Sequence, residues 1–248
     1  MNKLNLTFPE DWTNLSDKQL KYIYKLISKS YSYEQIKIFC LFRWNNLKVV
    51  ARSGAGDYLL SHNGSRKIFQ VSVVQIAEIF PFLSWLDRIP DYPVRVNSLG
   101  WHKALTADFQ GVPFEKFLMA ENIYQGYIAT ENEDLLDQLA TVLYPSILPQ
   151  GKLKPWQRVA VFYWFGSLKN FFSVKFNEFF QPASSNSNDL SDSSNSVEES
   201  MNAQIRALTK GDVTKEKEIL QLDTWRALEE LNAQAREYRE FNQKYKNK

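Results

Sequence analysis

Apolar residues recur every three or four positions along much of this chain, a spacing that predicts amphipathic α-helices. Five stretches carry the pattern: residues 17–27, 33–44, 72–80, 113–143 and 156–180. Pro113 suits the first turn of its helix, because a proline there gives up no intrahelical hydrogen bond. A helix start at Glu131 or Asn132 divides that stretch into two helices. The chain is therefore expected to be mainly helical.

A second pattern, short apolar runs separated by turn residues, begins at Asn46. Three runs share it: residues 47–51, 57–60 and 67–71. The Asn63-Gly64 pair between two of these runs is a strong hairpin signal. We expect a small antiparallel sheet of at most three strands.

Three shorter segments are further strand candidates: residues 4–9, 94–96 and 104–109, the last two paired across a turn at Gly100. The fold class predicted from both patterns is α+β, with a mainly helical body and a small antiparallel sheet between Asn46 and Phe109.

The helical pattern stops at Gln181–Ser200, which contains eight serines, four acidic residues and no basic ones. So few apolar side chains cannot offset the backbone entropy lost on ordering, about 1–2 kcal/mol per residue. This composition predicts a flexible linker. The predicted organisation is a body at 1–180, the linker at 181–200 and a separate helical tail at 201–248.

The tail resumes the helical pattern after a boundary at Gly211 and Asp212. Leu228, Leu231, Ala235 and Tyr238 follow a 3-4-3 spacing that places them on one helix face. Trp225 belongs to a second, slightly rotated apolar group. Such a helix either folds back on its own body or self-associates, or it presents its apolar stripe to a partner helix. If the helix binds a partner helix, the candidate contact residues are Trp225, Leu228, Leu231 and Tyr238.

Composition limits the classes of function. The net charge of +2 predicts no general attraction to nucleic acid. The start of the chain lacks a signal-peptide pattern, and no run of 18 uncharged apolar residues predicts a membrane span. A cytoplasmic protein that contacts no membrane is expected. The one cysteine, Cys40, lies in an apolar run and is interpreted as a buried, inert thiol.

Residues with potential chemistry are few. His62 and His102 lack the spacing of a metal site, and Gly54-Ala55-Gly56 lacks the lysine of a phosphate loop. An acidic group at a helix start is better explained by the helix dipole than by catalysis; it comprises Glu131, Glu133, Asp134 and Asp137. We predict no catalytic residue, no metal site and no cofactor.

One basic stripe deserves a comparison with nucleic-acid binders. Four lysines fall three or four residues apart on the first helix: Lys18, Lys21, Lys25 and Lys29. Tyrosines at 22, 24, 31 and 33 lie nearby in sequence, where stacking on bases is conceivable. The stripe is short, and a solvated helix face explains it without a ligand, so nucleic acid is not an expected partner.

Two segments resemble phage proteins. A helical body, a linker and the tail TKGDVTKEKEILQLDTWRALEELNAQAREYREF resemble the tail assembly chaperones of long-tailed bacteriophages. GVPFEKFLMAENIYQGYIATENEDLLDQLATVLYP, residues 111–145, is similar to a segment of proteins encoded by phages or prophages of Bacteroides-type genomes. Each segment covers about a sixth of the chain.

The resemblance implies a non-enzymatic chaperone in the bacterial host cytoplasm. It would bind the long tape-measure protein, the tail-tube subunits, or both, during tail assembly. In that family a longer product often arises by ribosomal frameshifting. Two alternatives remain from the residues themselves: an intracellular adaptor or regulatory protein that forms a homo-oligomer through its tail, and an enzyme with a pocket built from scattered residues.

Overall fold

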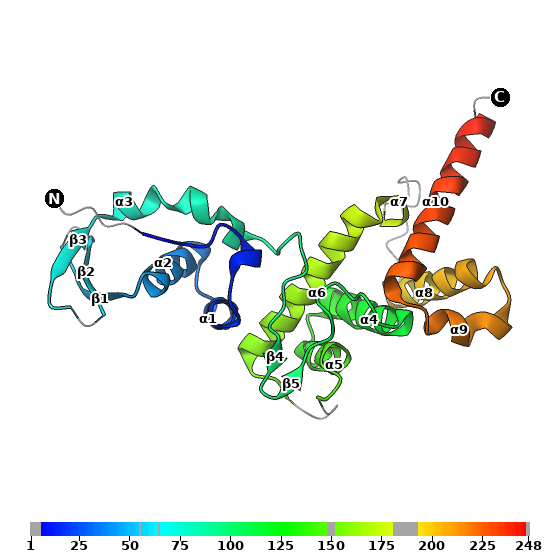
Figure 1. Ribbon diagram of the computed structural model, residues 1–248, viewed down its shortest axis with the longest axis horizontal. Coiled ribbons are helices and arrows are strands. Elements are labelled where there is room, and N and C mark those ends of the chain that lie inside the picture. The colour runs from blue at the N-terminus through cyan, green and yellow to red at the C-terminus, as the bar shows by residue number, and fades with distance from the viewer. Residues whose placement is uncertain (1–5, 55, 64, 148–151, 181–192, 247–248) are drawn as a thin grey trace. The chain divides into compact units, whose positions relative to one another are not determined.

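A computed structural model describes residues 6–54, 56–63, 65–147, 152–180 and 193–246 (Figure 1). The chain divides into two compact units, residues 1–90 and 91–248. The fold is α+β and mainly helical, with a small antiparallel sheet, as the sequence predicted.

The first unit combines helices with a three-stranded sheet. Its elements in chain order are η1 (Trp12–Asn14), α1 (Asp17–Ile27), α2 (Tyr33–Trp44), β1 (Leu47–Arg52), β2 (Tyr58–His62), β3 (Ile68–Val71), α3 (Val73–Ala77) and η2 (Phe80–Asp87). The sheet is antiparallel with the order β1-β2-β3, which confirms the predicted hairpins.

Three helices of this unit begin with the same local signal, a serine N-cap followed three residues later by a glutamine. In each, the serine oxygen accepts from the glutamine backbone N–H and the glutamine side chain accepts from the serine N–H. This reciprocal pair satisfies N–H groups that the helix itself leaves unpaired. The pairs are Ser16 and Gln19, Ser32 and Gln35, and Ser72 and Gln75.

A buried apolar cluster joins α2 and α3 to the sheet; it comprises Phe42, Leu47, Tyr58, Leu60 and Ile76. A second contact fixes η2 against α2. There, Lys37 Nζ lies 2.6 Å from Asp87 Oδ2, and Lys37 is only 6% exposed.

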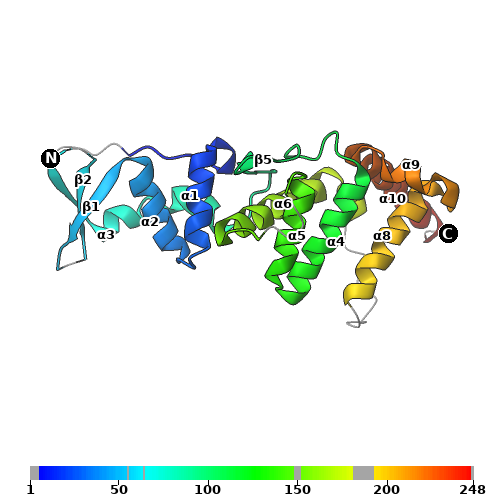
Figure 2. The same ribbon diagram turned by 90° about the horizontal axis from the view of Figure 1, so that it is seen from below.

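The second unit is built around α6. Its elements are β4 (Ser98–Leu99), β5 (His102–Lys103), α4 (Phe114–Thr130), α5 (Glu133–Leu143), α6 (Pro155–Lys175), α7 (Asn177–Phe180), α8 (Ser193–Thr209), η3 (Val213–Lys215), α9 (Glu216–Leu220) and α10 (Thr224–Lys246). Figure 2 shows α4 and α5 side by side, and both contact α6. The apolar middle of α6 is buried there, including Val161, Trp164, Phe165 and Leu168.

The strand predicted at residues 94–96 is absent from the structure. Val94 and Val96 are buried, but the Val94 N–H donates to Ser167 Oγ on α6, at 3.1 Å. The Tyr144 hydroxyl donates to the Val96 carbonyl at 2.8 Å. Their apolar spacing therefore reflects packing on helices, and the two-stranded pairing forms further along, between β4 and β5.

Other predicted boundaries also shift. Residues 6–9 form no strand, and residues 1–5 lie outside the described part of the chain. The long aromatic helix ends at Lys175, because Phe176 has φ −115° and ψ 48°, and α7 follows separately. Of the predicted linker, residues 181–192 lie outside the described residues, and residues 193–200 form the start of α8.

The division of the chain differs from the predicted one. The boundary lies at Pro90, and α9 and α10 belong to the same unit as α4–α7. The predicted separate tail at 201–248 is thus part of the second unit. Composition reveals a polar linker, but whether the helix beyond it finds an apolar partner depends on tertiary packing.

Candidate interaction surface on the C-terminal helix

The start of α10 is tied to the loop before α4. The Thr224 N–H and hydroxyl both donate to the Val112 carbonyl, at 2.8 and 2.7 Å. The Phe114 N–H donates to the Leu222 carbonyl at 2.7 Å. The Asp223 carboxylate accepts from the Trp225 N–H at 3.0 Å and so caps α10. This network fixes where α10 leaves the unit.

Trp225 lies in the aromatic core of the second unit. Its indole N–H donates to the Asp108 carbonyl at 2.7 Å. Its ring centroid lies 5.9 Å from those of Phe171 and Phe176, and 6.3 Å from that of Phe172. A tryptophan satisfied in this way anchors the helix to α6.

The next turns of α10 are also docked. Leu228 and Leu231 are 0% and 4% exposed. Asn232 Oδ1 accepts from the Phe179 N–H at 3.0 Å, and the Arg239 guanidinium lies 2.7 Å from the Glu178 carboxylate. Both contacts join α10 to α7.

Beyond Leu231, α10 carries two exposed aromatic side chains. Tyr238 is 69% exposed and Phe241 is 56% exposed. Figure 1 shows this part of α10 extending away from the other helices of the second unit. The structure therefore packs three of the four predicted partner residues, Trp225, Leu228 and Leu231, within their own unit and leaves Tyr238 exposed.

Sequence reasoning missed Phe241 as a member of the exposed surface. Phe241 follows Tyr238 by three residues, a spacing that places neighbours on one helix face. That spacing was a usable signal. We define the distal aromatic pair as Tyr238 and Phe241.

A hollow of about 450 Å³ lies beside the docked half of α10. Its walls come from α4, α7, α8 and α10, and they include Phe179, Phe180 and Leu231. Glu121 also lines it; its Oε1 lies 2.5 Å from Lys169 Nζ, whereas its Oε2 is buried without a partner among the described residues.

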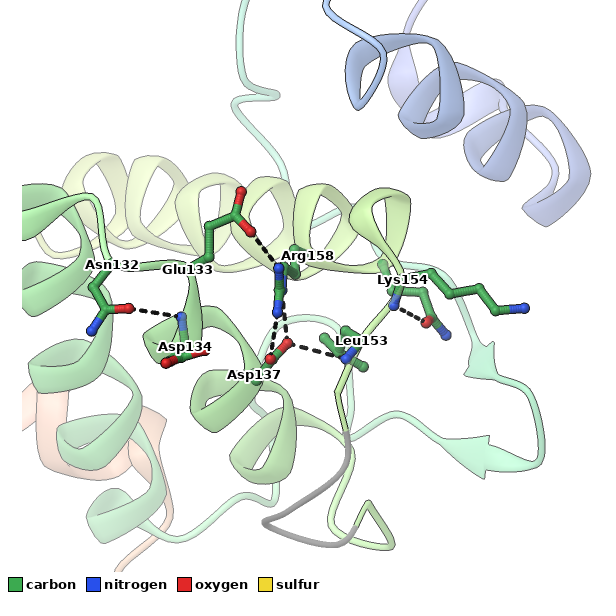
Figure 3. Close-up of polar contacts among 8 residues, drawn as sticks. Asn132, Glu133, Asp134, Asp137, Leu153, Lys154 and Arg158 are labelled. Atoms are coloured by element: carbon green, nitrogen blue, oxygen red, sulfur yellow. Dashed lines mark hydrogen bonds and ion pairs between the residues drawn. The ribbon is translucent and has the colours of Figure 1, made fainter.

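The acidic group of the second unit holds two helices together (Figure 3). Asp137, 7% exposed on α5, accepts from Arg158 of α6 at 2.6 and 2.9 Å and from the Leu153 N–H at 3.2 Å. Glu133 pairs with the same guanidinium, and Asn132 caps α5 by accepting from the Asp134 N–H. These partners account for Glu133 and Asp137 as a structural link, while Glu131 lies at the C-cap of α4 in the left-handed conformation.

The titration of this pair fits that role. Burial alone would raise the pKa of Asp137, but the hydrogen bonds from Arg158 and Leu153 outweigh it and bring the pKa below its ordinary value. In turn, the hydrogen bond with Asp137 raises the pKa of Arg158. Both groups are held in their charged forms.

The remaining residues with potential chemistry, Cys40, His62 and His102, each have their own local surroundings. Cys40 is fully buried, and burial raises its pKa to about 12, which suppresses the reactive thiolate. His102 Nδ1 lies 2.9 Å from Ser146 Oγ, while His62 is an exposed residue of β2 whose ring contacts Phe69. Within the described ranges, no three His, Cys, Asp or Glu side chains come close enough to hold a metal ion.

Comparison with known proteins identifies no matching family model, no similar curated protein and no similar solved structure. None of the helices described has both the length and the apolar character needed to cross a bilayer.

Proposed function

We propose that this protein is a non-enzymatic binding protein that presents the distal turns of α10 to an α-helical protein partner. The observation that carries this proposal is the exposure of the distal aromatic pair on a helix whose earlier apolar residues are buried. Tyr238 and Phe241 are 69% and 56% exposed, against 0% and 4% for Leu228 and Leu231.

The anchoring of α10 supports the proposal energetically. A helix presented from a fixed base loses less conformational entropy on binding than a free segment does. Trp225 and Thr224 supply that base through their contacts with Asp108 and Val112. Aromatic anchors surrounded by charged side chains are typical of helix-in-groove recognition.

The resemblance to tail assembly chaperones suggests the identity of the partner. We propose the tape-measure protein, whose long helices expose apolar faces before the tail tube surrounds them, and the tail-tube subunit as a second partner. Binding would keep those apolar faces from aggregating in the cytoplasm of the bacterial host.

The test co-expresses the full chain with the proteins encoded beside it and measures the soluble fraction of the longest helical one. The key variant is Tyr238→Ser with Phe241→Ser. Its matched control is Val174→Ser, which removes an equally exposed apolar side chain, 76% exposed, from α6 of the same unit. We expect the double variant to lose the partner and the control to retain it.

A shortened chain ending at Gln234 tests directly whether the distal turns are needed for binding. It keeps Trp225, Leu228 and Leu231, which the second unit buries or half-buries, and removes the distal turns. Retention of the partner by this chain would overturn the proposal. Self-association through the same turns, measured as a dimer by light scattering and abolished by the double variant, would favour the adaptor interpretation instead.

A further inference from the structure

A basic groove lies between α1 and α2 in the first unit. It encloses about 540 Å³, within the range of pockets that hold small organic ligands, roughly 300–1,000 Å³. Its lining residues come from one face of α1 and the end of α2: Ser16, Lys18, Gln19, Lys21, Tyr22, Lys25, Arg43 and Trp44.

Two cations of this groove, Lys18 and Arg43, are available to a ligand. Neither Lys18 nor Arg43 is paired with a carboxylate in the part of the chain that the structure describes. Lys21 Nζ lies 3.9 Å from Asp17 Oδ2, a distance at the limit of an ion pair. Lys18 and Arg43 therefore bring positive charge to the groove that no carboxylate of the described residues neutralises.

The charge of the whole unit reinforces this local field. Residues 1–90 hold twelve Lys and Arg against seven Asp and Glu, a net charge of +5, which leaves −3 for residues 91–248. The overall charge of +2 conceals this difference. A unit with this balance attracts anions over a distance of about 8–10 Å at ordinary salt.

Aromatic side chains lie among the cations. The Arg43 guanidinium lies 5.8 Å from the centre of the Tyr22 ring. Trp44 stacks on Trp85, with ring centroids 6.3 Å apart and planes 9° apart, which holds its indole in place. The indole N–H of Trp44 is buried and finds no acceptor among the described residues. A buried donor without a partner is uncommon in native proteins.

We propose that this groove binds single-stranded nucleic acid, with phosphates on Lys18, Lys25 and Arg43 and a base against Tyr22 and Trp44. Rows of cations with interleaved aromatic side chains are the usual basis of single-strand binding. An acidic peptide would use the cations but would have no need of the aromatic side chains. The sequence favoured a solvated face because the stripe of lysines on α1 is short; in the structure, α2 brings Arg43 and Trp44 to these lysines.

The test measures fluorescence anisotropy of a labelled 12-nucleotide oligothymidylate titrated with the full chain at several salt concentrations. Lys18→Gln with Lys25→Gln removes two exposed cations from the groove. We expect this variant to bind the oligonucleotide at least tenfold more weakly. The slope of the logarithm of the binding constant against the logarithm of salt concentration should also be less steep by about 1.4, because each lost phosphate contact reduces it by about 0.7.

The matched control is Lys48→Gln with Lys67→Gln, which removes the same charge from exposed positions in β1 and just before β3 of the same unit. It should bind as the unchanged chain does. Equal loss in both double variants would overturn the proposal, because binding would then follow net charge alone, and so would the absence of binding to the unchanged chain.

The aromatic contribution is tested at Tyr22. Tyr22→Phe should retain affinity, whereas Tyr22→Leu should weaken it by about fivefold or more through lost stacking. Thermal unfolding of each variant checks that the fold is kept. A labelled polyglutamate peptide that binds as tightly as the oligonucleotide would identify an acidic peptide as the ligand and would overturn the assignment. The protein-binding experiment above depends on α10, so the two proposals fail independently.

Discussion

The two halves of α10 carry the same kind of side chain in opposite surroundings. Leu228 and Leu231 are buried against the second unit, whereas Tyr238, further along the same stripe, is 69% exposed. The first turns pack against α6 and α7 through Trp225 and Asn232, whereas in the later turns the Arg239 side chain reaches Glu178 of α7 and Tyr238 stays exposed. The apolar stripe of a helix therefore does not by itself indicate whether its residues are buried in the core or exposed to a partner. That depends on which of its residues the neighbouring helices cover.

The largest expected effect is at the docked half. Leu228→Ala removes a fully buried side chain, and we expect a loss of about 2–5 kcal/mol in the free energy of unfolding. Urea unfolding followed by circular dichroism measures it. A loss below about 0.5 kcal/mol would mean that the first half of α10 is not docked, and the two halves would be alike.

The next effect concerns the link between α5 and α6 in the same unit. Asp137→Asn weakens the hydrogen bonds to Arg158, and we expect a loss of about 1.5–3 kcal/mol at neutral pH. Because the folded pKa of Asp137 is lowered, its contribution is complete above the unfolded pKa, near 3.9. That contribution is lost as the pH falls through the lower folded value.

Urea unfolding of the unchanged chain and of Asp137→Asn at pH 7 and at pH 3 tests this prediction. The difference between the two proteins should shrink at the lower pH. A difference that is the same at both pH values would show that the charge of Asp137 does not stabilise the fold.

A smaller effect is expected at the base of α10. Thr224→Val keeps the shape of the buried side chain but removes the hydroxyl that donates to the Val112 carbonyl. We expect a loss of about 1 kcal/mol, measured by thermal unfolding. If the helix start is positioned by the Thr224 N–H alone, this variant will match the unchanged chain.

The smallest effect on stability is expected at the distal pair. Tyr238→Ser with Phe241→Ser changes two exposed side chains, so we expect the free energy of unfolding to stay within about 0.5 kcal/mol. The same variant is expected to lose the helical partner. Substantial destabilisation would mean that the distal turns contact the unit in solution, and the proposed contrast within α10 would disappear.

The two candidate sites show which functional residues a sequence pattern can predict and which it cannot. The sequence identified the tail stripe and the lysines of α1, because both follow a helical period within one element. It did not identify Phe241 as exposed, nor Arg43 and Trp44 as neighbours of those lysines. Those relations join residues on different elements or depend on where a covering helix ends.

By itself, the sequence determined the helices and the three-stranded hairpin arrangement, because these depend on residues a few positions apart. Only the tertiary structure decided the boundary at Pro90, the pairing of Asp137 with Arg158 and the docking of α10 beside α7. Each of these joins distant segments, and the free energy that selects them comes from burying apolar surface and satisfying polar groups, which no local pattern specifies.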